Sequence, residues 1–506
     1  PPRPPPRARD PATPPLPGAP PDARSPAVQV DEAGGLACTD VTPEGFLFDM
    51  GGHVIFSHYK YFDELIDAAV GEGDAHWNTL QRVSYVWLKD RWVAYPFQNN
   101  ISALGKDDQI ECLQGLVDAK VLCATAQGKP ANFDEWILRV MGEGIANIFM
   151  RPYNFKVWAV PTTDMQSGWL GERVATVDVK KAIHNVLYSK EEGNWGPNAV
   201  FRFPKEGGTG GIWKAVAKLL PQDRMDFGAG YKLVSVDKDA QVATLANGEQ
   251  VRYKALISTV PLDIMCQMTG KPEWAPNTVD GLFRSNSNIV GIGLRGLSPH
   301  GSKCWLYYPE DDCPFYRTTV FSNYARKNCP GDEAKLPTLM VADGREHADA
   351  EAREGPWWSL MFEVSQSEKK PLDLTPTKLP GIAGTWPKVV ADTIQGAINT
   401  KLIRPEDEIV SIYHRRIDYG YPTPSVGRDS VVNKALPYLK EHNIWNRGRF
   451  GSWKYEVANQ DHSCMLGVEA ADNIMVGAKE LTLNHPGVVN PTKNMETSFK
   501  SMGRLG

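Results

Sequence analysis

Long apolar runs, basic clusters and paired cysteines are all missing from this 506-residue chain. No stretch reaches the roughly twenty apolar residues that a membrane-spanning helix needs, so we expect no membrane segment and no membrane partner. The net charge of −5, without a long run of Lys and Arg, argues against a nucleic-acid partner, whose phosphates require clustered cations. The composition, 42% hydrophobic and 23% charged, is typical of a globular protein of several domains.

The eight cysteines lie apart from one another, and no C-x-x-C pair occurs among them. This spacing predicts neither a disulfide framework nor a cysteine zinc site, and we expect no metal. Reduced thiols are typical of cytosolic proteins, so we expect a cytoplasmic location. The proline-rich residues 1–27 contain no aromatic residue and no apolar segment of a signal peptide, which predicts a disordered tail.

A glycine-rich turn for a dinucleotide phosphate is also missing from the N-terminal part of the sequence. Rossmann-like domains begin with a strand, a Gly-x-Gly-x-x-Gly turn and a helix whose N-terminus receives the pyrophosphate. No such turn precedes Gly34. Residues 28–32 are instead typical of the following strand, which ends in a carboxylate for the adenosine ribose, either Asp31 or Glu32. Two explanations stay open: an incomplete N-terminus, or a loss of standard cofactor binding.

A glycine pair beside a histidine is the most informative feature that the sequence does contain. Because Gly51 and Gly52 lack a Cβ, they can adopt positive φ and lie against a flat ligand such as a flavin ring, with His53 next to it. Residues 34–36 precede this pair at a spacing typical of FAD-binding domains. Without further evidence, the pattern is better explained by a glycine-rich strand end with a buried structural histidine.

Hydrophobic periodicity outlines the remaining elements. Helical spacing predicts helices over 59–70, 107–122, 133–149, 180–187 and 467–483. Alternation predicts a hairpin over 83–95 around Lys89-Asp90, and strands on both sides of the Asn247-Gly248 turn between 231 and 259. One antiparallel sheet is predicted from strand-like runs at 289–294, 304–308, 318–321, 338–341, 358–364 and 409–415. The prolines and lysines of residues 365–388 predict an exposed loop.

Six longer runs of specific residues follow one another along the chain. They include Trp-Val-Ala-Tyr-Pro-Phe-Gln-Asn-Asn at 92–100 and Met-Arg-Pro-Tyr-Asn-Phe-Lys-Val-Trp-Ala at 150–159, and the others lie at 169–173, 313–317, 420–424 and 451–463. Together they resemble UDP-galactopyranose mutases of the eukaryotic, fungal-like type, from Gly34 to about Pro486. The resemblance implies membership of the family more firmly than activity, because one fold hosts many functions.

This resemblance implies an α/β fold with three discontinuous domains. The first is a Rossmann-like FAD-binding domain that is incomplete at its N-terminus, the second is helical, and the third is a substrate domain built on an antiparallel sheet. Their expected residues are, in that order, 28–80 with 193–265 and 445–490; 100–190; and 81–99 with 270–425. We expect residues 34–56 to pack against residues 451–475.

The chemistry that we expect is likewise what the resemblance implies. These enzymes interconvert UDP-galactopyranose and UDP-galactofuranose with reduced FAD, whose N5 attacks the anomeric carbon as UDP leaves, without net oxidation. We further expect NADPH or NADH as the reductant, a role in supplying galactofuranose to a cell wall, and a homo-oligomer. In such a reaction the protein has to orient the cofactor and stabilise the charge of the leaving group.

The resemblance also assigns roles to individual residues. Arg173 and Arg317 match the planar cations that stabilise the diphosphate leaving group, and His53 matches the residue whose backbone carbonyl lies near flavin N5. The implied substrate contacts are Tyr95, Phe97 and Gln98 for the uracil, Asn154 and Trp158 in the substrate loop, Tyr307, Tyr324, Tyr421 and Tyr455 for the diphosphate, and Asn198 and Asn459 for the sugar. The implied cofactor contacts are Asp31, Gly34, Gly35, Leu36, Gly51, Gly52, His53, Arg449, Asn459, Gln460 and Ser463, with the glycine-rich loop 207–211 beside them.

Each assignment has a structural alternative. Arg173 could neutralise a helix dipole, the tyrosines could be core residues, and Trp158 could be packing; His58 is better explained as a structural residue at a helix start. Two further functions stay open: a flavin amine-oxidase-like oxidoreductase, and a non-catalytic nucleotide-sugar-binding relative that has lost FAD. Because the phosphate-binding turn and its central strand are missing, we expect the chain as written to bind FAD poorly.

Overall fold

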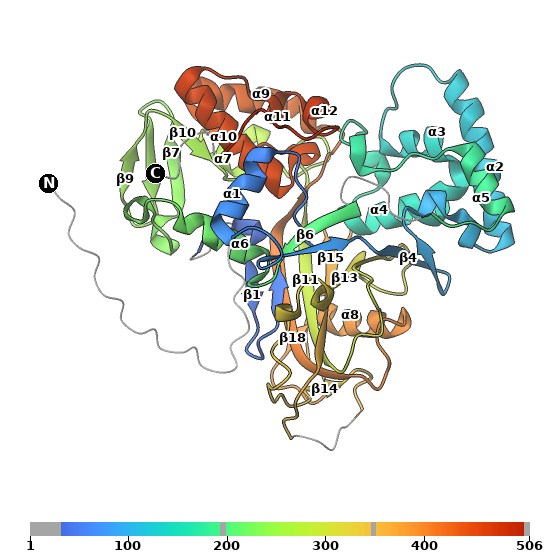
Figure 1. The fold of residues 1–506 in the computed structure, drawn as a ribbon. Helices are drawn as coiled ribbons and strands as arrows, with labels where there is room; N and C mark the ends of the chain where they lie inside the picture. The colour runs from blue at the N-terminus through green and yellow to red at the C-terminus, as the bar shows by residue number, and fades with distance from the viewer. Residues whose placement is uncertain (1–31, 193–198, 346–350, 500–506) are drawn as a thin grey trace.

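The computed structural model describes residues 32–192, 199–345 and 351–499 (Figure 1). The expected disordered tail at 1–27, the ribose candidate Asp31 and the sugar contact Asn198 lie outside these residues. Most helices form two groups on opposite sides of the molecule, and a large sheet lies between these groups (Figure 1). Among the helices of the described residues, none combines the length and the hydropathy that crossing a membrane requires.

The large sheet has eight strands in the order β14-β18-β11-β15-β13-β12-β4-β5. Its strands are β4 (Ser84–Leu88), β5 (Arg91–Ala94), β11 (Arg284–Arg295), β12 (Trp305–Tyr307), β13 (Arg317–Val320), β14 (Met340–Val341), β15 (Trp357–Gln366) and β18 (Glu408–Pro422). Strand β11 pairs antiparallel with both β15 and β18. The predicted antiparallel sheet is therefore confirmed for its central strands.

The hairpin at one edge of this sheet corrects the prediction in one respect. The expected hairpin over 83–95 forms, and its turn residues Lys89 and Asp90 have φ angles of 49° and 61°, as a two-residue type I′ turn requires. Its strand β4, however, runs parallel to β12, so the sheet is mixed. Local alternation shows that residues form a strand, but it carries no information on the direction of a distant neighbour.

Both faces of the central strands are buried. On one face Val290 and Phe362 belong to a core that includes Val389 of helix α8 (Lys388–Asn399). On the other face Ile289 belongs to a second core, which contains Phe48. A sheet that is covered on both sides holds its strands in fixed register, so side chains at the strand ends are positioned precisely.

Residues 365–388 form the largely exposed segment that their prolines and lysines predict, but parts of it are ordered and packed. They contain the short strands β16 (Pro376–Thr377) and β17 (Trp386–Pro387), which pair with each other. Leu379 is buried in the core under α8, and Leu372 packs against it. These apolar residues stand at irregular intervals among polar ones, so no regular period reveals that they pack.

The spacing Gly-x-Gly-x-x-Gly occurs at residues 291–296, but it has no relation to phosphate binding. Gly291 and Gly293 lie within the antiparallel strand β11, with no helix following. A Cβ on Gly291 would lie 2.6 Å from the ring of Phe48, and a Cβ on Gly293 would lie 2.6 Å from the ring of Phe46. Glycine therefore makes room here for two aromatic rings that cover the sheet.

Replacing Gly293 by Ala should lower the free energy of unfolding by about 1–3 kcal/mol, because the added methyl group would overlap the buried Phe46 ring. Gly467→Ala is the matched control. Gly467 lies inside α10 (Gln460–Val476), a Cβ there meets nothing within 4 Å, and Ala should stabilise the helix by up to about 1 kcal/mol. Urea unfolding measures both variants, and equal free energies for the two would contradict the packing argument.

The helical region between the sheet strands agrees with the sequence prediction except at one glycine. The helices predicted over 107–122 and 180–187 are confirmed as α2 (Lys106–Thr125) and α5 (Val179–Leu187). The helix predicted over 133–149 is divided, because Gly142 inside α3 (Phe133–Ile145) has a φ of 76°. A Cβ on Gly142 would lie 1.9 Å from the carbonyl oxygen of Gly115, so α2 and α3 touch backbone to backbone there. A π-helical turn, η4 (Ala146–Met150), then leads into α4 (Arg151–Trp158).

The remaining elements join distant parts of the sequence around the Gly51–His53 turn. Ile55 shares a core with Met465, and Leu36 packs against a core that contains Leu466, so residues 34–56 pack against 451–475 as expected.

The predicted helix over 59–70 is confirmed as α1, whereas the helix expected over 467–483 is wrong in its bounds, since α10 ends at Val476. The other bounds are β1 (Thr39–Val41), β2 (Leu47–Asp49), α1 (Lys60–Val70), β3 (Trp77–Gln81), β6 (Val200–Pro204), α6 (Gly208–Lys218), β7 (Leu233–Asp237), β8 (Val242–Leu245), β9 (Gln250–Arg252), β10 (Leu256–Ser258), α7 (Leu262–Met268), α9 (Arg428–Glu441), β19 (Ile444–Asn446), α11 (Leu481–Asn484) and α12 (Pro486–Val489).

Parallel pairing is short in this part of the molecule. Strand β10 pairs in parallel with β19 over three residues. Together with β4 and β12 these are the parallel strand pairs among the described residues, and Tyr59 and Asn494 form an isolated parallel bridge. The strands around the Asn247-Gly248 turn form as predicted, and β7, β8 and β9 make a separate antiparallel sheet.

Candidate active site

A buried ion pair between neighbouring strands forms the centre of the candidate site. Arg317 begins β13, and the strand register places it opposite Glu363 of β15. The guanidinium Nε lies 2.7 Å from Glu363 Oε1, and Nη2 lies 2.8 Å from Oε2. Burial alone would raise the pKa of Glu363, but the charge and hydrogen bonds of Arg317 hold that pKa below its usual value. Both groups are therefore charged at neutral pH.

Glu363 connects this pair to the glycine turn that the sequence singles out. The backbone N–H of Gly52 donates to Glu363 Oε1 over 3.0 Å, and the hydroxyl of Tyr316 donates to Oε2 over 2.6 Å. Neither Glu363 nor Tyr316 was predicted from the sequence. One signal was available, because Glu363 is the single charged residue in the otherwise uncharged strand β15.

Glycine is required at the two positions of the turn for different reasons. This corrects the expectation that both residues adopt positive φ. Gly51 has a φ of 135°, whereas Gly52 is required for space. A Cβ on Gly52 would lie 3.0 Å from Trp305 Nε1 and 3.1 Å from Thr319 Oγ1. The turn therefore lies in close contact with the sheet, and the N–H of His53 closes it onto the carbonyl of Gly51.

His53 is uncharged at neutral pH. Burial is the main cause that lowers its pKa, to about 4, and the positive charges of Arg449 and Arg317 lower it further against the opposing effect of Glu363. Its Nδ1 is buried and has no hydrogen-bond partner. A neutral imidazole cannot donate the proton that a general acid requires near pH 7, which agrees with a role of its backbone.

A second group of side chains forms an aromatic wall beside Arg173. The Trp158 ring lies 5.3 Å from the Tyr421 ring and 4.7 Å from the Tyr455 ring, measured between centroids. Arg173 lies over Tyr455 at 4.8 Å, and Arg449 lies over Tyr421 at 5.0 Å. The Tyr316 hydroxyl reaches that of Tyr421 at 3.3 Å. The hydroxyl contact links the wall to the ion pair. Arg173, predicted for the diphosphate, and Arg449, predicted for the cofactor, both contact this wall.

Arg173 is held by neutral groups only. Its Nη1 donates to Asn459 Oδ1 over 3.3 Å, and its Nη2 donates to the carbonyl of Glu456 over 3.1 Å. Its Nε is buried without a partner. Because no carboxylate among the described residues forms an ion pair with this guanidinium, its charge is available to an anionic ligand.

Other predicted residues lie in a neighbouring aromatic group. The Tyr95 and Tyr307 rings lie 5.0 Å apart, and the Tyr153 ring lies 5.6 Å from that of Tyr307. Arg82 lies over Tyr95 at 5.1 Å. The sequence analysis did not single out Tyr153 or Arg82, because an isolated Tyr or Arg carries no local signal.

Four predicted substrate contacts are deeply buried and have partners in the protein core. Phe97 is stacked on Phe149, and Tyr324 is enclosed by aromatic rings that include Phe203. The side-chain amides of Gln98 and Asn154 donate to the carbonyls of Ala175 and Met150, both over 2.7 Å. Their assignment to a ligand stays a prediction.

The predicted cofactor residues lie in two places, at residues 34–36 before β1 and at the start of α10. Gly34 and Gly35 have φ angles of 127° and 54°, and Leu36 packs between two cores. The carboxylate of Glu32, the alternative ribose contact, instead forms an ion pair of 2.8 Å with Lys214 of α6. Gln460 Oε1 accepts from Trp213 Nε1 over 2.7 Å, and the N–H of Ser463 donates to the carbonyl of Asn459 over 2.9 Å.

Two buried polar atoms at the turn, His53 Nδ1 and Trp305 Nε1, lack hydrogen-bond partners within the described protein. Buried polar groups are almost always paired, so these two atoms indicate a polar ligand at the turn. A flat heterocycle with several donors and acceptors, such as a flavin, suits these atoms and the close approach at Gly51 and Gly52.

Asp49 anchors the glycine-rich loop 207–211 to β2. It is fully buried and accepts hydrogen bonds from the hydroxyl and the N–H of Thr209, over 2.6 and 3.2 Å, and from the hydroxyl of Thr39. Burial nevertheless dominates and raises its pKa from 3.8 to about 7. The loop is thus held by a carboxyl group that folding makes harder to ionise.

This raised pKa predicts a pH dependence of stability. As pH rises from about 4 to about 7, the unfolded chain releases the Asp49 proton first, so the free energy of unfolding should fall, by on the order of a few kcal/mol, and become level above pH 7. Asp49→Asn should lack this decline. Denaturant unfolding of both proteins between pH 4 and 8 measures it, and parallel curves for the two would show that Asp49 is not responsible.

Comparison with known proteins agrees with this geometry. No protein-family model matches the sequence. A crystal structure of reduced UDP-galactopyranose mutase is 44% identical to this chain, covers 93% of it and 92% of its own length, and superposes with a TM-score of 0.82. An Exiguobacterium sp. 255-15 protein assigned as a protoporphyrinogen oxidase is 10% identical, with a TM-score of 0.57 over 86% of this chain and 90% of its own, and shows the shared fold alone. The chain therefore belongs to the UDP-galactopyranose mutase family.

Proposed function

We propose that this chain is a flavin-dependent isomerase that interconverts UDP-galactopyranose and UDP-galactofuranose without net oxidation. The observation that carries the proposal is the 44% identity to a UDP-galactopyranose mutase over nearly all of both chains. The two half-buried arginines and the aromatic wall between them support it, because a nucleoside diphosphate presents charge and a flat base to the protein.

FAD is the cofactor of this proposal, and when bound it supplies the nucleophile for the anomeric carbon. The unpaired atoms around Gly51 and Gly52 would hold its ring system, with His53 and Arg449 beside it. Asn459, Gln460 and Ser463, at the N-terminus of α10, are the further contacts that we propose. NADPH or NADH is the reductant that we propose.

Arg173 and Arg317 would hold the diphosphate from two sides, in different ways. Glu363 occupies the Nε and Nη2 of Arg317, which leaves Nη1 to reach a phosphate oxygen. Arg173 carries no carboxylate partner and presents its full charge. Both cations are fixed before the diphosphate leaves, so they stabilise its developing charge without reorganisation. The hydroxyls of Tyr421 and Tyr455 would supply further donors.

The remaining predicted contacts complete the proposed substrate site. Tyr95 and Tyr307, with Phe97 and Gln98 behind them, would hold the uracil, and Asn154, Trp158, Tyr324 and Asn459 would contact the diphosphate and the sugar. The division into FAD-binding, helical and sheet domains belongs to this proposal as well. All eight cysteines lie in the described residues as free thiols, which favours a reducing compartment such as the cytoplasm. There the product would supply galactofuranose for a cell wall.

Helix α2 supports the proposal of a homo-oligomer. Ile110, Val117 and Val121 are 54%, 51% and 63% exposed, and their spacing of seven and four residues places them on one stripe of the helix. Such a stripe is typical of a helix that packs against a partner helix, and we propose a second copy of this chain. Light scattering of the protein and of Val117→Glu tests it: the variant should have a lower mass.

Two alternative functions have their own signatures. A flavin amine-oxidase-like oxidoreductase would consume oxygen as it turns over, whereas the proposed isomerase should be active only when reduced and should consume none. A non-catalytic nucleotide-sugar-binding relative would bind UDP without any flavin absorption. The flavin absorbance per protein after purification measures how much FAD the chain binds. Oxygen uptake with an amine substrate would overturn the proposed function.

A further inference from the structure

His58, Asp461 and His462 form a buried cluster outside the proposed substrate site. Their side chains are 3%, 0% and 0% exposed, and one nitrogen or oxygen atom of each lies within 4.8 Å of the others. The cluster lies where the segment after the Gly51–His53 turn meets the first turn of α10. Two parts of the chain that are 403 residues apart are joined at this point.

The hydrogen bonds around His462 settle which of its nitrogens carries the hydrogen. The Asn490 amide nitrogen donates to the carbonyl of Glu456 over 3.1 Å, which orients the amide so that its oxygen faces His462 Nε2 at 2.9 Å. An amide oxygen only accepts, so His462 Nε2 has to be the donor. In a neutral imidazole the other nitrogen, Nδ1, is then a bare acceptor.

This bare nitrogen faces another acceptor. His462 Nδ1 lies 3.4 Å from Asp461 Oδ1, and both atoms are buried without a hydrogen-bond partner. Asp461 Oδ2 is already engaged, because it accepts from the N–H of His58 over 2.9 Å and lies 2.7 Å from His58 Nδ1. Two acceptors that face each other in a dry interior repel unless a cation lies between them.

The spacing of one atom pair matches a coordinated metal ion, whereas the 2.7 Å between His58 Nδ1 and Asp461 Oδ2 is a hydrogen-bond distance that metal binding would lengthen. Two ligands at roughly 2.0–2.2 Å from a tetrahedral zinc ion are about 3.3–3.5 Å apart, which is the spacing of His462 Nδ1 and Asp461 Oδ1. The hydrogen bond from His462 Nε2 to Asn490 is the orienting contact that metal-binding histidines almost always make. One carboxylate with two imidazoles suits zinc and not calcium or magnesium, which prefer sets of oxygen ligands.

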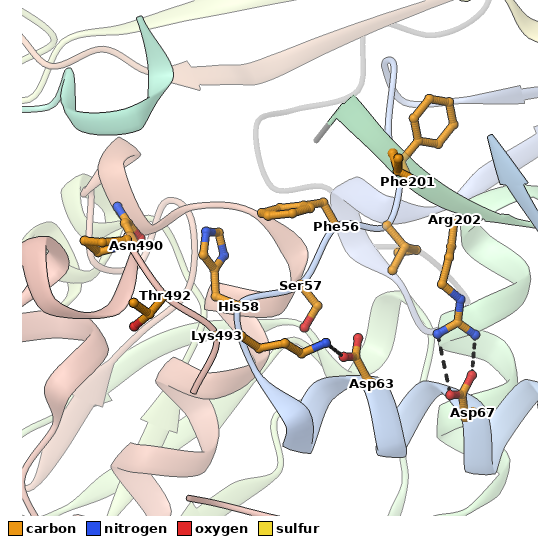
Figure 2. Close-up of a pocket in the computed structure, with 13 residues that line it drawn as sticks. Phe56, Ser57, His58, Asp63, Asp67, Phe201, Arg202, Asn490, Thr492 and Lys493 are labelled. Carbon is orange, nitrogen blue, oxygen red and sulfur yellow. Dashed lines mark hydrogen bonds and ion pairs between the residues drawn. The ribbon is translucent and has the colours of Figure 1, made fainter. Parts of the chain in front are cut away.

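We propose that His58, Asp461 and His462 bind one divalent transition-metal ion, zinc, which joins the segment at residue 58 to the N-terminus of α10. A pocket of about 580 Å³ provides the path by which such an ion enters, because His58 and Asn490 form part of its lining. Figure 2 shows both side chains at one end of this pocket, with the ion pair Lys493–Asp63 beside His58 and the ion pair Arg202–Asp67 at the other end. The fourth position of the metal would be open toward this pocket, for a water molecule.

The consequence for the protein is a fixed helix start. Asn459 and Gln460, directly before Asp461, hydrogen-bond to Arg173 and to Trp213. An ion held by Asp461 and His462 would fix these neighbours in place, so metal binding would stabilise the fold between α1, α6 and α10. The proposal concerns structure and does not depend on which substrate the protein converts.

Metal analysis of the purified full-length protein tests the proposal. Dialysis against dipicolinate should yield a stripped protein, and titration with zinc chloride should restore about one zinc ion per chain and raise the melting temperature. His462→Gln removes Nδ1 but keeps an amide that can donate to Asn490, and it should weaken zinc binding on the order of a hundredfold or more and abolish the thermal shift. Asp461→Asn is a second variant of nearly equal size, with the same expected loss.

His300→Gln is the matched control, since His300 is also buried and its Nε2 contacts a carbonyl, that of Leu402, far from the cluster. It should bind zinc as the unaltered protein does. The proposal is overturned if the stripped protein takes up no zinc, since His462 then holds a proton at Nδ1 instead. It is overturned equally if His462→Gln and Asp461→Asn bind zinc as tightly as His300→Gln, since the ion then binds elsewhere.

Discussion

Replacing Arg317 by Ala should reduce both catalysis and stability. The lost cation would cost about 2–4 kcal/mol of leaving-group stabilisation, roughly a thirtyfold to thousandfold fall in rate. The fold should lose a further 3–5 kcal/mol or so, because the buried carboxylate of Glu363 would be left unpaired. Steady-state kinetics and denaturant unfolding of the same preparation separate the two effects.

The double variant Arg317→Ala/Glu363→Gln is the control for this result. Removing the charge at residue 363 should restore most of the lost stability, since no unpaired charge remains in the interior. The rate should stay low, because the cation is still absent. A double variant with full activity would show that Arg317 acts only as the structural partner of Glu363.

Arg173→Ala should lose activity to a similar extent, about 2–4 kcal/mol in the barrier, but little stability. Its guanidinium donates only to an amide oxygen and a carbonyl, so no buried carboxylate is left unpaired. Arg173→Lys should recover part of the activity, since the charge remains but the planar set of donors is lost. Unchanged UDP binding in both alanine variants would show that neither arginine contacts the diphosphate.

Local sequence patterns account for most of the fold. The turn at Lys89-Asp90 and the helices α1, α2 and α5 follow from alternation, from spacing and from the residues that end them. The parallel pairing of β4 with β12 could not be predicted, because it depends on a contact between residues about 220 positions apart. The interruption of the helix at Gly142 could not be predicted either, because it depends on a backbone contact with Gly115 that no local pattern encodes.

The candidate site was predictable only where the resemblance supplied the residues. Arg173, Trp158, Tyr421 and Tyr455 do lie together, as that assignment implies. Glu363 was missed, because its importance comes from the residue across the strand and from the turn at Gly52. The His58 cluster was missed for a similar reason, because His58 is 403 residues away from Asp461 and His462 in the sequence. Local patterns predict helices and strands, but they do not predict which residues the packing of these elements brings together in a site.

The most direct test of the proposed function is the conversion of UDP-galactofuranose. The full-length protein is incubated with excess FAD under dithionite, so that weak cofactor binding cannot hide activity, and the nucleotide sugars are separated by chromatography. We predict that UDP-galactopyranose accumulates catalytically, that no dithionite is consumed beyond reduction of the flavin, and that the oxidised enzyme is inactive. Absence of UDP-galactopyranose with reduced FAD bound, or consumption of one reductant for each turnover, would contradict the account.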